Sequence, residues 1–165
     1  MRFSIEQNVE VSPDAAVAAY GTPAFYEGRP ERDNISVIEV VSHSASGSRV
    51  VIEVRFKFTG TVSSAVRAVV DPTKMSWVTK TEVLLNERRT RWQVLPDHYP
   101  SRLTSSGTYH FGDGLVGPDS AVIKVEGELK VHVPFVGGTV ERVIVSGLRS
   151  YIAAEVTSLP DVPLG

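Results

Sequence analysis

The side chains that could carry acid–base chemistry are few in this sequence, and they are widely spaced. The candidates are Glu39, Tyr109, Tyr151 and Glu155, because each falls on or beside an apolar face where a titratable group could reach a buried substrate. No spacing suggests a serine, a histidine and an acid acting together. We therefore assign no catalytic residue, and the sequence leaves enzymatic activity uncertain while favouring its absence.

Potential metal and anion ligands are equally dispersed. The four histidines, His43, His98, His110 and His132, form no metal-like pair, and there is no cysteine. We expect no metal site and no cofactor. The pair Gly137-Gly138 at the start of a helix could bind an anion, but close packing of the helix on a sheet is the preferred explanation.

Composition excludes several classes of function. The chain has 165 residues, 42% of them hydrophobic and 22% charged, with a formal net charge of -2. This is typical of one soluble globular domain spanning residues 1–165, and it argues against a nucleic-acid partner. No apolar run approaches the roughly 18 residues of a membrane span, and the start does not resemble a signal peptide. We expect a cytoplasmic protein, and the oligomeric state stays open.

A long helix between Val133 and Leu159 is the element around which the chain is organised. After Pro134 there is no proline before Pro160, and an apolar arc covers about half of the helix circumference. That arc comprises Val140, Val143, Ile144, Gly147, Leu148, Tyr151, Ile152, Val156 and Leu159. Glu155 falls inside the arc, where it could pair with an arginine, face a cavity, or reach water beyond the sheet. The last arrangement is the preferred one.

Alternating patterns predict strands along most of the remaining chain. They cover residues 2–11, 35–43, 49–58, 76–85, 90–95, 103–111 and 121–133, with turns at 44–47 and 86–89. Two short helices follow the first strand, beginning at Ser12-Pro13-Asp14 and at Pro23. Residues 60–74 are ambiguous, and we expect a covering loop with a short helix from Ser63 to Val70. Matching the inward faces of one hairpin pairs Val83 with Trp92 and Thr81 with Val94.

This order, one strand, two helices, six strands and a long helix, predicts an α+β fold. Adjacent hairpins with one polar face describe an antiparallel sheet of about seven strands, whose apolar face the last helix must cover. Gly107 and Gly127 point inward and mark where the sheet can bend sharply. A curved sheet around one helix can leave an apolar gap, the usual form of a small-molecule site.

The same order carries a resemblance to a known superfamily. The segment Val133-Pro134-Phe135-Val136-Gly137-Gly138-Thr139-Val140-Glu141 opens the last helix as in the START-related (SRPBCC) superfamily, which includes the birch pollen allergen and polyketide cyclases. Asp14-Ala15-Ala16-Val17, Pro23-Ala24-Phe25-Tyr26 and Trp92 resemble the opening helices and central strand of an uncharacterised actinobacterial family within it. The resemblance implies the helix-grip fold, with a cavity for an apolar or amphipathic ligand between sheet and helix.

The inward positions define a candidate ligand-binding set. It comprises Phe56, Phe58, Trp77, Thr79, Thr81, Trp92, Tyr109, Ile144, Leu148 and Tyr151. Further polar residues, Gln7, Thr90 and Ser105, fall on the same face, and together they favour a cavity with a few polar anchors over a plain core. The leading hypothesis is binding or carriage of a lipid-like or polyketide-like small molecule. The alternatives are a cyclase or dehydratase of the same fold, and an interaction module with a closed core.

Overall fold

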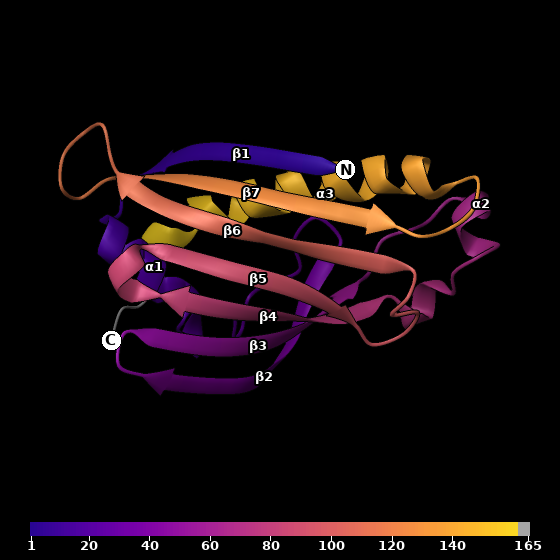
Figure 1. Ribbon diagram of the computed structural model, residues 1–165, viewed down its shortest axis with the longest axis horizontal. Coiled ribbons are helices and arrows are strands. Elements are labelled where there is room, and N and C mark those ends of the chain that lie inside the picture. The colour runs from indigo at the N-terminus through magenta and orange to yellow at the C-terminus, as the bar shows by residue number, and fades with distance from the viewer. Residues whose placement is uncertain (162–165) are drawn as a thin grey trace.

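Seven antiparallel strands form a single curved sheet in the computed structural model, which describes residues 1–161 (Figure 1). The strands are β1 (Arg2–Val9), β2 (Ile35–Ser46), β3 (Arg49–Phe58), β4 (Ser76–Leu84), β5 (Arg89–Pro96), β6 (Leu103–Asp113) and β7 (Ala121–Val131). Their order in the sheet is β1-β7-β6-β5-β4-β3-β2. All connections from β2 to β7 therefore join neighbours, whereas β1 lies beside β7 and away from β2, the next strand in the sequence. The sheet confirms the predicted α+β class.

The helices lie at the ends and on one face of this sheet. They are α1 (Pro13–Tyr20), α2 (Ser64–Arg67) and α3 (Gly137–Thr157), with 3-10 turns η1 (Pro23–Phe25), η2 (Pro72–Lys74), η3 (Leu85–Glu87) and η4 (Leu159–Asp161). Figure 1 shows α3 running across the sheet, with α1 and α2 at opposite ends of the molecule. A long helix gripped by a curved sheet is the helix-grip arrangement that the sequence predicted.

The start of α1 follows the predicted signals. The Ser12 hydroxyl accepts a hydrogen bond from the Ala15 N–H at 3.2 Å, Pro13 occupies the first turn, and Asp14 provides the first-turn acid. The second helix is only the 3-10 turn η1, because Gly28, with φ of +70°, and Pro30 prevent its continuation. Both short helices therefore exist, but the second is a single turn.

The end of β2 differs from the prediction. β2 continues to Ser46, so the predicted turn at residues 44–47 is wrong. Ser44 pairs with Val51 and Ser46 with Arg49. Gly47, with φ of +59°, makes the tight turn and leaves no need for a longer loop.

The predicted register of the β4–β5 hairpin is also wrong, by two residues. Val83 pairs with Thr90, and Thr81 pairs with Trp92. The hairpin closes through η3 and Arg88, whose φ of +48° turns the chain one residue earlier than expected. A shift of two residues keeps every side chain on its predicted face, so the inward and outward assignments remain correct.

Gly107 and Gly127 are direct partners across β6 and β7, and the indole of Trp92 lies over both. A Cβ atom on Gly107 would stand 2.6 Å from Trp92 Cζ2 and 2.4 Å from the Glu126 carbonyl oxygen. A Cβ atom on Gly127 would stand 2.4 Å from Cζ of Phe3. The two glycines therefore make room for aromatic rings that pack directly on the sheet backbone.

Candidate ligand-binding cavity

A cavity of about 400 Å³ lies between the concave face of the sheet and α3. Strands β3 to β7 form one wall, α3 forms the opposite wall, and the segment between β3 and β4 borders one end. All ten residues of the candidate set line it: Phe56, Phe58, Trp77, Thr79, Thr81, Trp92, Tyr109, Ile144, Leu148 and Tyr151. The periodic patterns thus bring together residues from four strands and one helix.

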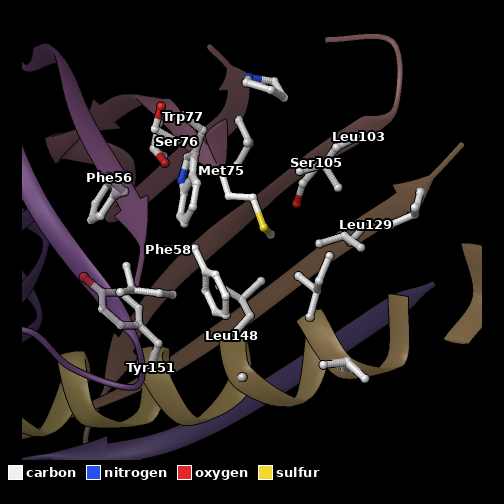
Figure 2. A pocket seen from close by; sticks show the side chains of 18 of the residues that line it. Phe56, Phe58, Met75, Ser76, Trp77, Leu103, Ser105, Leu129, Leu148 and Tyr151 are labelled. Carbon is white, nitrogen blue, oxygen red and sulfur yellow. The ribbon is translucent and has the colours of Figure 1, made fainter. Parts of the chain in front are cut away.

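The wall is predominantly apolar and aromatic. Phe56 and Trp77 stack with ring centroids 5.9 Å apart, and Tyr151 meets Phe56 edge to face at 6.3 Å. Figure 2 shows Leu148 and Tyr151 projecting from α3 into the cavity, with Leu148 beside Phe58 and Met75 reaching in from above. Interleaved aromatic rings of this kind provide a large apolar contact area for a ligand.

α3 divides its surface between the cavity and the sheet. Val140, Ile144, Gly147 and Leu148 line the cavity and are only partly buried. A second face of α3 is buried and includes Glu141, Val145 and Val156, and the helix contacts β1 and β7. Ile152 is buried and also lines the cavity. The predicted arc therefore covers the cavity side and also includes Val156 of the buried face, but it omitted Glu141 and Val145. It also included Val143, which is 69% exposed at the edge of the cavity.

One end of the cavity contains a buried polar cluster centred on Glu155. Arg29 Nη1 donates to Glu155 Oε2 at 2.6 Å and to the Tyr151 hydroxyl at 2.8 Å. The Tyr109 hydroxyl donates to Glu155 Oε1 at 3.4 Å. The preferred expectation that Glu155 reaches water is wrong, because an arginine from the segment after η1 neutralises it inside the fold.

Arg29 itself is enclosed by aromatic rings and backbone. Its guanidinium lies 4.3 Å from the Phe25 ring centroid and 5.1 Å from that of Tyr26, and its Nη2 donates to the Phe25 carbonyl oxygen. Burial opposes the charge, but the attraction and hydrogen bond of Glu155, together with Tyr151 and Tyr26, outweigh it and raise the pKa of Arg29. The guanidinium is therefore charged and lies directly against the Glu155 carboxyl group.

The tyrosines around this cluster are held in the neutral form. Burial raises the pKa of Tyr20, Tyr26, Tyr109 and Tyr151, and the negative charge of Glu155 raises each of them further. The Tyr26 hydroxyl donates to the Tyr20 carbonyl oxygen at 3.0 Å. Tyr26 and Tyr109 donate hydrogen bonds, Tyr151 accepts one from Arg29, and the neutral phenols do not act as bases near neutral pH.

The fourth titratable candidate, Glu39, does not reach the cavity. Its carboxylate pairs with Arg55 at 2.6 Å on the outer face, where Arg55 also contacts Asp97. Three of the four acid–base candidates thus gather at one end of the cavity, and Glu39 belongs to a surface network.

Polar residues also occur along the middle of the cavity wall. The Ser105 hydroxyl and the Trp92 indole N–H are buried and have no hydrogen-bond partner among residues 1–161. In Figure 2 the Ser105 oxygen points toward the cavity. Gln7 and Thr90 face inward but lie elsewhere. Gln7 donates to Thr157 at 2.7 Å, whereas Thr90 is fully buried beside the sheet.

The opposite end of the cavity is bordered by the segment from residue 60 to 75. It contains α2 and η2, which confirms the expected short helix but shortens it to Ser64–Arg67. Arg102 fastens this segment by donating to the Val69 carbonyl oxygen, and its guanidinium lies 4.9 Å from the Tyr99 ring centroid. Val62, Val66 and Val70 turn toward the cavity. We refer to this end as the cavity mouth.

The Gly137-Gly138 pair is only partly explained by close packing. A Cβ atom on Gly137 would stand 2.8 Å from the Val131 carbonyl oxygen, whereas Gly138 faces open space. In the described part of the chain, no three or more acidic or histidine side chains cluster to hold a metal ion. Likewise, no helix between residues 1 and 161 is long and apolar enough to cross a membrane.

Arg29 is the residue at the polar end of the candidate site that the sequence analysis did not name. The available signal was Glu155, for which an arginine partner was one of three open arrangements. Met75, Leu103 and Leu129 also line the cavity and were not in the candidate set. No sequence feature distinguished a cavity position from a core position at these residues.

The fold is similar to that of START superfamily proteins and of related enzymes with solved structures. A START superfamily protein from Mycobacterium smegmatis matches with a TM-score of 0.55 and 16% identity, over 93% of this chain and 92% of that one. The Zhui aromatase/cyclase from Streptomyces sp. R1128 matches with a TM-score of 0.57 and 8% identity, over 97% and 93%. Norcoclaurine synthase from Thalictrum flavum, in complex with dopamine and hydroxybenzaldehyde, matches at 0.58 and 19%, over 100% and 88%. These identities establish the fold alone.

At the level of sequence, the chain belongs to the family described as "Protein of unknown function (DUF2505)", which matches residues 4–159. This confirms the resemblance to an uncharacterised family, while its actinobacterial origin stays a prediction. No curated protein matches the sequence.

Proposed function

We propose that this protein binds and carries a hydrophobic or amphipathic small molecule in the cavity between the sheet and α3. The observation that carries the proposal is the cavity itself, about 400 Å³ with mainly apolar walls. That volume lies within the range typical of small-molecule sites. The structural relatives support the proposal, since they include an aromatase/cyclase and a synthase in complex with small aromatic molecules.

The polar groups of the wall narrow the ligand class. The indole N–H of Trp92 can only donate, and the Ser105 hydroxyl can donate or accept. A ligand that satisfies both would carry an oxygen atom along an otherwise apolar body, as lipid-like and polyketide-like compounds do. Leaving such groups unpaired against an all-hydrocarbon ligand would cost binding free energy.

A cyclase or dehydratase activity is the second candidate, and the cluster around Glu155 bears on it. Glu155 already binds Arg29 and Tyr109, and the raised pKa values keep the tyrosines protonated. A general base needs free lone pairs within reach of the substrate and a pKa near the operating pH. The cluster therefore favours anchoring of a ligand over acid–base catalysis, and a carrier over an enzyme.

Gly147 offers a direct test, because it lines the cavity on α3 and a Cβ atom there would meet nothing within 4 Å. Gly147→Leu fills cavity space. Gly147→Ala raises the helix propensity at this position by a similar amount but adds little volume. We expect saturable binding of an apolar fluorescent probe to the wild type and to Gly147→Ala, and weak binding to Gly147→Leu. Equal binding by all three proteins, or no saturable binding to the wild type, would contradict the proposal.

A further inference from the structure

The cavity mouth carries apolar side chains that the fold does not use. Phe135, in the loop between β7 and α3, is fully exposed at 106%, and Val143 on α3 is 69% exposed. Phe135 also adopts φ of +67°, a left-handed conformation that is rare for a bulky residue. A strained backbone that presents a phenyl ring to solvent indicates a role outside the core.

These side chains lie at the same end of the molecule as α2. Figure 1 shows the loop that leads into α3 beside α2, beyond the ends of the strands. Val143 lines the cavity edge together with Val66 and Val70 of the α2 segment. The exposed apolar groups therefore border the route by which a ligand would enter or leave the cavity.

Positive charge surrounds the same end. The segments 60–75, 98–103 and 132–143 contribute four cations, Arg67, Lys74, Arg102 and Arg142. Their acids are Asp71, which binds the N–H and hydroxyl of Thr73, and Glu141, which is buried and accepts from the Val131 N–H. Asp33 is exposed and also lines the cavity beside this segment, so the three exposed cations Arg67, Lys74 and Arg142 outnumber the exposed acids Asp33 and Asp71.

We propose that this end of the molecule docks on a membrane surface rich in anionic lipids. The docking surface comprises Arg67, Lys74, Phe135, Arg142 and Val143. Phe135 and Val143 would insert among the headgroups, and the cations would face lipid phosphates. An apolar protein partner would account for Phe135 and Val143, but the surrounding cations favour an anionic surface. Docking in this orientation places the cavity mouth against the bilayer, where an amphipathic ligand can transfer without crossing water.

Vesicle co-sedimentation of the ligand-free protein tests this proposal. We expect binding to vesicles of phosphatidylcholine mixed with phosphatidylglycerol, little binding to phosphatidylcholine alone, and weakening by salt. Phe135→Asn removes the ring but tolerates the left-handed backbone, and we expect it to weaken binding roughly tenfold, given the apolar area lost. Arg67→Gln and Lys74→Gln should each weaken binding by about fivefold.

Leu115 provides the matched control. It is 83% exposed in the loop between β6 and β7, which Figure 1 places at the opposite end of the molecule. Leu115→Asn should bind vesicles as the wild type does. Gly147→Leu should also bind normally, because docking does not require an open cavity, and this separates the present proposal from ligand carriage.

Three results would overturn the proposal. The first is a lack of binding to either vesicle, and the second is an equal loss of binding by Leu115→Asn and Phe135→Asn. The third is a change in oligomeric state on gel filtration for Phe135→Asn, with vesicle binding unaltered, since this would make the surface a contact between protein copies.

Discussion

Arg29 and Glu155 form a buried ion pair across 126 residues of sequence, with 2.6 Å between Nη1 and Oε2. Their side chains are only 5% and 6% exposed. The pair fastens the segment after η1 to the C-terminal half of α3, and it lies behind Tyr109 and Tyr151 at the inner end of the cavity. This one ion pair therefore holds the segment after η1 against α3 and also forms part of the polar end of the candidate site.

Removing one member of this pair should destabilise the protein strongly. Glu155→Leu leaves the Arg29 guanidinium buried without a counter-charge, and we expect a loss of about 3–5 kcal/mol in the free energy of unfolding. The double variant Arg29→Met/Glu155→Leu should recover much of that loss, because no uncompensated charge remains. Urea denaturation of the single and double variants measures this coupling, and additive losses would contradict it.

The buried tyrosines should make stability depend on alkaline pH. The folded-state pKa values of Tyr20, Tyr26, Tyr109 and Tyr151 are raised by burial and then by Glu155, whereas an unfolded tyrosine ionises near pH 10. The unfolded chain therefore loses these protons first. Stability should be complete below about pH 10 and fall as the pH rises further.

Phenolate absorbance and urea midpoints across this range test the expectation. The absorbance of the four buried phenols should develop together with unfolding, and Tyr20→Phe should lessen the alkaline decline. A smooth titration of all the tyrosines in the folded protein would show that the cluster is open to solvent.

A single sequence encodes well the periodicity of each helix or strand and the face of that element that is buried. The alternation along β3, β6 and β7 identified the inward face at each position, and the arc on α3 identified its cavity side. All ten candidate residues consequently line the cavity. Each of these inferences is local, because it depends only on the spacing of apolar residues within one element.

Contacts between residues of different elements could not be predicted in the same way. The shift of β5 by two residues leaves every face unchanged, so alternation cannot distinguish Thr81–Trp92 pairing from the predicted Thr81–Val94 pairing. The partner of Glu155 comes from a loop with no periodic pattern. From the sequence, an arginine partner was one of three open arrangements for Glu155, and exposure to water was preferred over it.

Gly107 and Gly127 should respond differently to alanine. At Gly127 the nearest obstacle is the far end of the Phe3 ring, at 2.4 Å from the added Cβ atom. At Gly107 it is the Glu126 carbonyl oxygen, also at 2.4 Å. We expect each alanine to lower the free energy of unfolding by about 1–3 kcal/mol. Phe3→Leu should restore part of the stability lost in Gly127→Ala, whereas no side-chain change should restore that lost in Gly107→Ala.

Thermal denaturation of the glycine variants, alone and with Phe3→Leu or Trp92→Leu, separates the two cases. Rescue of Gly107→Ala by Trp92→Leu would show that the indole, and not the backbone contact, limits that position.

The segment at the cavity mouth should open more readily than the sheet. Residues 60–74 are mostly exposed and contain only one helical turn and one 3-10 turn. We expect fast amide exchange here, slowed when an apolar probe occupies the cavity. Arg102→Met removes the tether to Val69 and should speed exchange in this segment more than in β6. Exchange as slow as that of the strands in the free protein would exclude a mobile cover.

Truncations on α3 distinguish a cavity wall from a closely packed core. Ile144 and Leu148 line the cavity and are only partly buried, whereas Val125 on β7 is fully buried. Val125→Ala should cost about 2 kcal/mol or more, since it opens a void in a packed layer. Ile144→Ala and Leu148→Ala remove more atoms, yet they should cost less than the roughly 2–5 kcal/mol of a core position, because these side chains already border open space. They should instead alter the affinity for an apolar probe.

Tyr151 is unsuitable for this comparison, because truncating it also removes an acceptor of Arg29. Core-sized losses at both Ile144 and Leu148, without a change in probe binding, would favour a closed interaction module over a carrier.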